Sequence, residues 1–161
     1  MPTMSDNLAA TLSVSIRELP AVRAAYLDCQ LDPEQDNFQK IHASFQRVQA
    51  WLRERGYDPY TVLNVGTLYA GDGSPSSYGC CVQVPEEVQT SSEGVGIQEL
   101  PGGRYAVVSI TKDPAIIGDA IGRFYGEYVP QNKLEIDGTR PMYEIYYERT
   151  MEYCVPIRGG L

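Results

Sequence analysis

Apolar and polar positions follow nearly the same order in two stretches of the chain that start 81 positions apart. Residues 14–33, laid over residues 95–114 without a gap, share nine of twenty amino acids, whereas ordinary usage would give roughly one match by chance. Each stretch predicts a strand interrupted at Pro20 or Pro101, because proline cannot donate a hydrogen bond within a sheet. The repeat therefore predicts an internal duplication. The shared pairs are Val14/Val95, Ile16/Ile97, Glu18/Glu99, Leu19/Leu100, Pro20/Pro101, Arg23/Arg104, Ala25/Ala106, Asp32/Asp113 and Pro33/Pro114.

A helical pattern follows each of these stretches. The Asp-Pro pairs at 32–33 and 113–114 predict a helix N-cap with proline at the first helical position. Apolar residues then recur at i, i+3 and i+4 spacing, and we expect Gly56 to end the first helix and Pro130 the second. The apolar positions are Phe38, Ile41, Phe45, Val48 and Leu52 in the first helix and Ile117, Ile121, Phe124 and Tyr128 in the second.

Two strand-like segments follow each predicted helix, so the chain has the order β-α-β-β twice. The composition of residues 71–77, GDGSPSS, predicts a turn between the first two of these segments. We expect a single α+β domain over residues 1–161, with repeat one at about 12–85 and repeat two at about 93–158. Its duplicated β-α-β-β units would be related by a pseudo-twofold axis. They would form an antiparallel sheet with the helices on one face and a ligand groove on the other.

The strand with the sequence PMYEIYYER carries a carboxylate among aromatic residues. Because side chains alternate along a strand, we expect Met142, Glu144 and Tyr146 to face the groove, with Glu152 and Cys154 beside them on the next strand. Glu144 has two interpretations. It is either a solvated carboxylate on an uncovered sheet face, or a partly desolvated one suited to pairing with a cation or to proton transfer.

Tyrosine is favoured over phenylalanine in this chain, with 12 tyrosines against three phenylalanines. Tyrosine joins an apolar ring to a polar hydroxyl, so this bias is typical of an amphipathic contact surface. The candidates for the aromatic wall of the groove are Tyr78, Tyr105, Tyr128 and Tyr146, each of which has packing in the core as its alternative.

Charge and hydropathy narrow the classes of partner. The formal net charge is −8 and the 13 Lys and Arg are dispersed, so the basic patch typical of a nucleic-acid binder is missing and no direct nucleic-acid binding is expected. The field favours a small cationic ligand. No apolar run approaches the roughly 18 residues needed to cross a bilayer, and the first residues lack the positive start of a secretory signal, which predicts a cytoplasmic protein without membrane contact.

The cysteines and the single histidine predict neither a metal site nor a cofactor. Cys29, Cys80, Cys81 and Cys154 form no CxxC pair, so we expect reduced thiols rather than zinc ligands or a disulfide framework. His42, the only histidine, lies within a helical pattern. A Ser-His or Cys-His nucleophile is therefore not predicted unless His42 itself is the base.

Four segments together resemble the GyrI-like effector-binding domain: ELPGGRYAVVSI, FYGEYVPQN, PMYEIYYE and EYCVPI. That family is shared by a bacterial DNA-gyrase inhibitor protein and by the ligand-sensing halves of AraC-type and MerR-type multidrug regulators. The resemblance implies a duplicated fold whose central groove takes up lipophilic, often cationic or aromatic molecules. The family's central glutamate falls on Glu144, and a groove aromatic that is often tryptophan falls on Tyr128. The family's YDDP segment is replaced here by YAGDGSP, so no ligand contact from that loop is predicted.

Three functions remain open. The first is a stand-alone binding protein that sequesters or senses toxic small molecules, holding an aromatic cation between Tyr105, Tyr128 and Tyr146 with Glu144 as countercharge. The second, implied by the resemblance, is a hydrolase of reactive cyclopropanoid, DNA-alkylating compounds. Glu144 would then be the general base and Tyr128 a proton donor. The third is a gyrase-interacting inhibitor protein whose acidic surface meets a basic partner.

Overall fold

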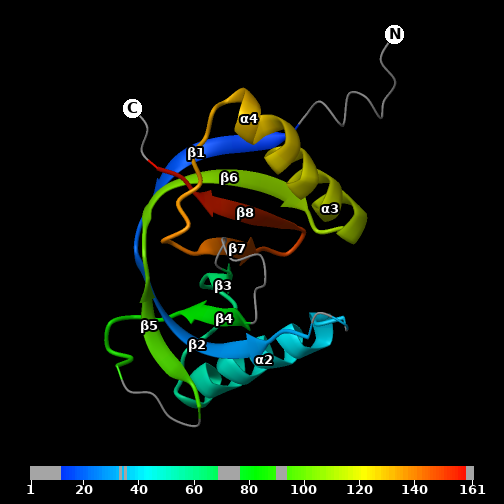
Figure 1. Ribbon diagram of the computed structural model, residues 1–161. Coiled ribbons are helices and arrows are strands. Elements are labelled where there is room, and N and C mark those ends of the chain that lie inside the picture. Colours follow the sequence, from blue (N-terminus) through cyan, green and yellow to red (C-terminus); the bar gives the residue numbers. More distant parts are fainter. Residues whose placement is uncertain (1–11, 33, 35, 69–76, 90–93, 159–161) are drawn as a thin grey trace.

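One sheet of eight strands and two helical segments make up the protein (Figure 1). The computed structural model describes residues 12–32, 34, 36–68, 77–89 and 94–158 of the 161. Most of the predicted turn at 71–77 lies outside these residues. The strands are β1 (Ser13–Leu19), β2 (Val22–Gln30), β3 (Asn64–Leu68), β4 (Ser77–Gln83), β5 (Gly96–Leu100), β6 (Gly103–Thr111), β7 (Met142–Tyr146) and β8 (Thr150–Pro156).

The strand order is β1-β6-β8-β7-β3-β4-β2-β5, and every neighbouring pair is antiparallel. The predicted α+β class with an antiparallel sheet is therefore confirmed. The central pair β3–β7 joins the strands of the first half of the chain to those of the second. Counted from the two ends of the sheet, the strands form four equivalent pairs: β1 with β5, β6 with β2, β8 with β4, and β7 with β3.

The predicted proline interruptions divide strands and send them to different neighbours. Strand pairing is interrupted between Leu19 and Val22, and again between Leu100 and Gly103. After the first break β2 pairs with β4 and β5, whereas β1 pairs with β6 of the other half. Leu19 faces Gly103, and Leu100 faces Val22. The two registers thus agree with the 81-residue offset of the sequence, although an evolutionary duplication stays a prediction.

Helix α2 (Phe38–Glu54) begins later than the sequence predicts. Asp32 does not cap it, because the helix begins only at Phe38 and its N-cap position is Asn37; the Asp32 carboxylate instead accepts from the Glu34 N–H at 3.0 Å. The Asp32 backbone also exchanges two hydrogen bonds with the Asn37 side chain. The predicted end is confirmed, since Gly56 follows the helix with a φ of 86° that glycine adopts without strain.

The second helical segment consists of α3 (Pro114–Arg123), a π-helical turn at Phe124–Tyr128 and the short α4 (Val129–Gln131). Its predicted N-cap is confirmed, because the Asp113 carboxylate accepts from the Ala115 N–H at 3.0 Å. The prediction that Pro130 ends the helix is wrong. Proline lacks an N–H donor, but it lies in the first turn of α4, where that loss is tolerated. No helix in the described ranges has both the length and the apolarity that a membrane span requires.

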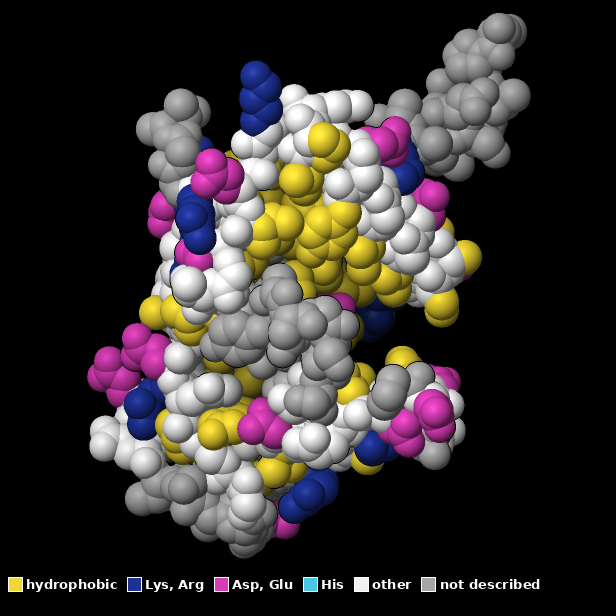
Figure 2. Space-filling model, in the orientation of Figure 1, with side chains coloured by type: hydrophobic (Ala, Val, Ile, Leu, Met, Phe, Trp, Pro, Cys, Tyr) yellow, Lys and Arg dark blue, Asp and Glu magenta, His cyan; other side chains and the backbone are white. Residues whose placement is uncertain are grey.

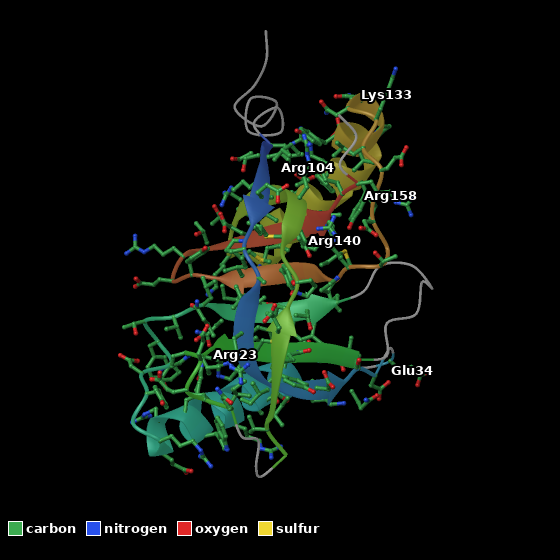
Figure 3. The ribbon with its side chains drawn as sticks, turned by 90° about the vertical axis from the view of Figure 1, so that its left-hand side faces the viewer. Arg23, Glu34, Arg104, Lys133, Arg140 and Arg158 are labelled. Carbon is green, nitrogen blue, oxygen red and sulfur yellow. The ribbon has the colours of Figure 1, made fainter. Side chains whose placement is uncertain are left out.

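Both helical segments pack on the same face of the sheet, where they cover two apolar clusters. One cluster holds α2 residues such as Val48 and Leu52 over β2 and β4, and the other holds Phe124 over β6 and β8. The opposite face carries a third cluster that includes Tyr143 and Ile145 of β7. In Figure 3 the two kinked strand pairs run across the central strands on that side.

This arrangement reverses one prediction about β7. Met142 and Tyr146 pack with the helix-side clusters, and Glu144 shares their face because strand side chains alternate. The prediction that these three residues face away from the helices is therefore wrong. The face expected to be an open groove is instead filled by a core against which Leu19 and Val22, on either side of the first kink, pack.

Candidate functional site

Glu144 lies in the middle of β7, close to the centre of the sheet. Its register partners are Gly66 on β3 and Tyr153 on β8. The residue is half-buried. Leu68 and Tyr146 are the partly buried hydrophobic residues that pack against both helix-side clusters. Glu144 therefore lies at the seam between the two clusters, where neither helix covers the sheet completely.

Two phenols hold one oxygen of this carboxylate. The Tyr78 hydroxyl donates to Glu144 Oε1 at 2.6 Å, and the Tyr146 hydroxyl donates to the same atom at 2.8 Å. The two hydroxyl oxygens also contact each other. Each phenol has a single proton to donate. An ionised Glu144 thus accepts a hydrogen bond from each hydroxyl. No proton then remains for a hydrogen bond between the two hydroxyl oxygens.

The environment keeps both phenols protonated. Burial raises the pKa of Tyr78 far above its ordinary value, and the neighbouring Glu144 charge raises it further. Burial likewise raises the pKa of Tyr146, again with a contribution from Glu144. Both side chains therefore act as neutral hydrogen-bond donors at any physiological pH. They can orient a carboxylate, but neither is suited to act as a phenolate nucleophile.

A glycine on β3, which has no side chain, makes this arrangement possible. Tyr78 belongs to β4 and Glu144 to β7, so the Tyr78 ring must cross the intervening strand. It crosses at Gly66, where an added Cβ would lie 1.7 Å from the Tyr78 hydroxyl oxygen and 2.2 Å from Cζ. The sequence reasoning did not single out Gly66. The available signal was a glycine inside a strand pattern, which often marks a close approach of another group.

The second oxygen of Glu144, Oε2, differs from the first in its contacts with the described residues. Among the described residues, Oε2 has no hydrogen-bond partner, and no buried side-chain oxygen there lacks one. Figure 2 shows a hollow that opens between the half carrying α3 and the half carrying α2, with hydrophobic side chains gathered on the α3 half.

A second pair of phenols lies on the α3 side. The Tyr125 and Tyr153 hydroxyls are 2.8 Å apart, and both donate to the Met142 sulfur at 3.3 and 3.4 Å. Tyr128, a predicted site residue, stacks on Phe124 with 5.8 Å between ring centroids and is half-buried. These rings form the wall of the α3 half. None of them is hydrogen-bonded to Glu144, although the Glu144 charge contributes to the raised pKa of Tyr153, its partner on β8.

Tyr105 and Cys154 do not join this site. Both are fully buried in the cluster on the opposite face. The Tyr105 hydroxyl donates to the Pro141 carbonyl at 2.9 Å, and its ring stacks on Tyr143. Glu152, expected near Glu144, instead pairs with Arg17 at 2.8 Å. β8 faces as predicted, with Tyr153 toward the helices and Cys154 away from them, whereas β7 is reversed. The structure therefore brings together Tyr78, Tyr146 and Glu144 alone among the predicted ligand-binding residues.

The four cysteines are free and buried. Burial raises the pKa of the Cys80, Cys81 and Cys154 thiols to about 12 each. Thiols react as thiolates, so these groups are inert at neutral pH. The described residues contain no group of three His, Cys, Asp or Glu side chains placed to hold a metal ion.

A separate cavity of about 430 Å³ lies at the C-terminal end of α2, lined in part by Leu52, Tyr57, Asp58 and Gln83. It shares no lining residue with the Glu144 cluster. Its carboxylate, Asp58, is exposed and closes a local turn by accepting from the Tyr60 N–H. The phenol-held carboxylate of Glu144 is therefore the stronger candidate site.

Comparison with known proteins assigns this chain to a family. Residues 12–158 match the GyrI-like small molecule binding domain. The chain belongs to the GyrI-like family. Membership confirms the resemblance drawn from the sequence and makes ligand binding in general its function. Which ligand a GyrI-like domain takes depends on the residues of its own site.

Solved structures share the GyrI-like fold of this chain. The C-terminal domain of EcmrR has a TM-score of 0.71 at 12% identity, over 92% of this chain and 98% of that one. SAV2435 bound to tetraphenylphosphonium has a TM-score of 0.63 at 14% identity, over 92% and 95%. A hydrolase from Listeria innocua has a TM-score of 0.64 at 10% identity, over 91% and 92%. At such identities the likeness shows the fold alone.

One curated protein also matches by sequence. The outer membrane usher protein YraJ of Escherichia coli K12 is 24% identical over 146 residues, which cover 84% of this chain. They cover only 16% of the usher. The chain thus spans a small part of that relative, and the match carries no argument about activity.

Proposed function

We propose that this GyrI-like domain binds lipophilic aromatic cations in the hollow between α2 and α3, for sequestration or sensing of toxic compounds. The observation that carries the proposal is the state of Glu144: two phenols hold Oε1, and Oε2 has no partner among the described residues. A half-buried carboxylate favours a cation because its remaining oxygen lacks full hydration. The Tyr146 ring beside it offers an aromatic contact for the same cation.

Two further features support a cation rather than an anion. The chain has a formal net charge of −8, which raises the local concentration of cations around it. The solved structure of SAV2435, which shares the fold, holds the aromatic cation tetraphenylphosphonium. We therefore take that cation as the probe for this chain.

The test compares Glu144→Gln with the parent protein. Glutamine keeps the shape and accepts the same two phenol protons, but it has no charge. We expect the Kd for tetraphenylphosphonium, measured by calorimetry, to rise about tenfold or more, as for the loss of one partly buried charge partner. Glu152→Gln, on the opposite face, is the matched control and should leave the Kd unchanged. Equal affinity of the Glu144→Gln and parent proteins would refute the proposal.

A hydrolase is the second candidate, and the fixed carboxylate favours it. A carboxylate held at Oε1 and open at Oε2 can position a water molecule and accept its proton, which is the general-base arrangement. A hydrolase from Listeria innocua shares the fold. The purified protein would be incubated with a cyclopropane-containing alkylating electrophile and the water adduct measured by mass spectrometry. Adduct formation at the same rate with the parent protein, with Glu144→Gln and in buffer alone would remove this candidate for that substrate class.

A further inference from the structure

Lys112 is a cationic residue beside the Tyr146 ring of the same site. It follows β6 directly and precedes Asp113, the N-cap of α3. Its backbone N–H donates to the Arg149 carbonyl at 3.0 Å, which ties this junction to the turn between β7 and β8. Lys112 is thereby fixed at the end of β7 that carries Tyr146.

The Lys112 ammonium lies beside the ring that also contacts Glu144. Lys112 Nζ is 5.9 Å from the centroid of the Tyr146 ring, which is within the range of a cation–π contact. The hydroxyl of the same ring donates to Glu144 Oε1 at 2.8 Å. One tyrosine ring therefore separates a fixed positive group from a fixed negative group.

The ammonium keeps free hydrogen-bonding capacity. Lys112 Nζ donates to the Tyr147 carbonyl at 2.7 Å, which uses one of the three donors of an ammonium group. Lys112 is exposed, and the ion pairs found among the described residues do not include it. The neighbouring Asp113 carboxylate is engaged with the Ala115 N–H. Two donors of Lys112 are therefore open to a ligand.

We propose that the preferred ligands of this site are aromatic zwitterions, with the cationic group at Glu144 Oε2 and an acidic group at Lys112. This inference rests on the function proposed above and narrows its ligand class. A ligand with only a positive charge gains the attraction of Glu144 but meets the repulsion of Lys112. A ligand that also carries a carboxylate turns that repulsion into a second ion pair.

The test uses two dyes that share one cationic aromatic core. Rhodamine B carries a free carboxylate, and its ethyl ester carries none, so their difference isolates the acidic group. We expect the parent protein to bind rhodamine B more tightly than the ester, measured by fluorescence anisotropy. In Lys112→Met we expect the Kd for rhodamine B to rise about threefold to fivefold, as for an exposed ion pair, and the Kd for the ester to stay level or fall.

Two further variants separate charge from structure. Lys112→Arg keeps the charge and should keep the preference for rhodamine B. Lys133→Met removes an equal charge at the far end of the α3 half, where Figure 3 labels it, and should change neither dye. The preference should also shrink as salt is added, because an exposed ion pair is screened.

The outcomes distinguish the two proposals. If Glu144→Gln weakens both dyes but Lys112→Met changes both by the same factor, the site binds cations and the zwitterion inference is overturned. If neither dye binds the parent protein, or if Glu144→Gln leaves both unchanged, the proposed function fails and this inference fails with it. A loss confined to rhodamine B in Lys112→Met supports both.

Discussion

The two central strands, β3 and β7, hold equivalent places in the sheet but carry opposite residues at their point of contact. Gly66 on β3 faces Glu144 on β7. The strand of the first half supplies an empty position, and the strand of the second half supplies a charge. Through the empty position passes Tyr78, which belongs to β4 of the first half. The difference teaches that the site needs both halves, one for the carboxylate and one for the space and the phenol that orient it.

The helices above these strands differ in the same sense. In the first half α2 is regular over 17 residues. In the second half α3 ends after 10 residues and continues as a π-helical turn of five residues. Such turns often occur at functional sites. Here the turn carries Tyr125 and Tyr128 into the wall of the α3 half. The half that carries the charge is thus also the half with the less regular helix.

The sharpest way to break the comparison is to fill the empty position with Gly66→Ala. The new methyl carbon would lie 1.7 Å from the Tyr78 hydroxyl oxygen, so the ring must leave Glu144. We expect the free energy of unfolding to fall by about 1–3 kcal/mol, as for overpacking. The Kd for tetraphenylphosphonium should rise about tenfold, because Glu144 loses a charge-assisted hydrogen bond. Chemical denaturation and calorimetry measure the two effects.

A second variant tests whether the displaced ring is the cause. In Gly66→Ala combined with Tyr78→Ala, the added methyl group no longer meets a phenol, so the two stability losses should not add. The affinity should stay low in the double variant. Unchanged tetraphenylphosphonium binding in Gly66→Ala alone would show that the passage over β3 has no part in the site.

A smaller effect is expected for Tyr78→Phe at alkaline pH. The pKa of Tyr78 is raised in the folded state from its ordinary value of 10.0, so folding stabilises the protonated phenol. This stabilisation is complete below pH 10 and is lost as the pH rises above 10, where the unfolded chain releases the proton and the folded protein keeps it. The parent protein should therefore lose about 1.4 kcal/mol more per pH unit than Tyr78→Phe.

The measurement is the free energy of unfolding between pH 9 and pH 11, with both proteins in the same denaturant. Tyr60→Phe is the matched control, because the Tyr60 side chain is 65% exposed. Parallel curves for the parent protein and Tyr78→Phe would contradict the buried hydrogen-bonded position of this phenol.

The smallest effect is expected at Gly118, which differs from Gly66 in having open space around it. Gly118 lies within α3, and a Cβ added there would meet nothing within 4 Å. Gly118→Ala should raise the free energy of unfolding by about 0.5–1 kcal/mol, because alanine loses less backbone entropy in a helix. Its tetraphenylphosphonium affinity should equal that of the parent. A loss of stability would mean that α3 packs more tightly at this point than the structure shows.

Much of the fold could be predicted from local sequence because local chemistry decides it. Pro20 and Pro101 each separate two strands. Gly56 has the left-handed conformation that ends α2. Asp113 caps α3 because its carboxylate accepts from the Ala115 N–H, and Pro114 has no N–H that needs an acceptor. The identical dipeptide at Asp32 does not cap a helix, since Asn37 offers its backbone a competing turn.

The site could be predicted only in part. The alternation of β7 correctly groups Met142, Glu144 and Tyr146, but alternation does not say which face the helices cover. That face depends on where the kinked strands cross, and this is set by contacts between the two halves. Gly66 and Lys112 were missed because a residue without a side chain and a lone exposed lysine have no pattern in sequence. Their roles follow only from what lies opposite them.

The exchange of strands at the kinks also bears on how the chain is completed during synthesis. β1, the earliest along the chain of the described strands, pairs with β6, whose residues are made about ninety positions later. Until then β1 has no neighbour in the sheet, and pairing over such a separation is slow. An isolated first half would keep an uncovered strand edge, which is a template for association with other chains. The pairing that links the two halves in the folded protein thus leaves β1 unpaired during synthesis until β6 has been made.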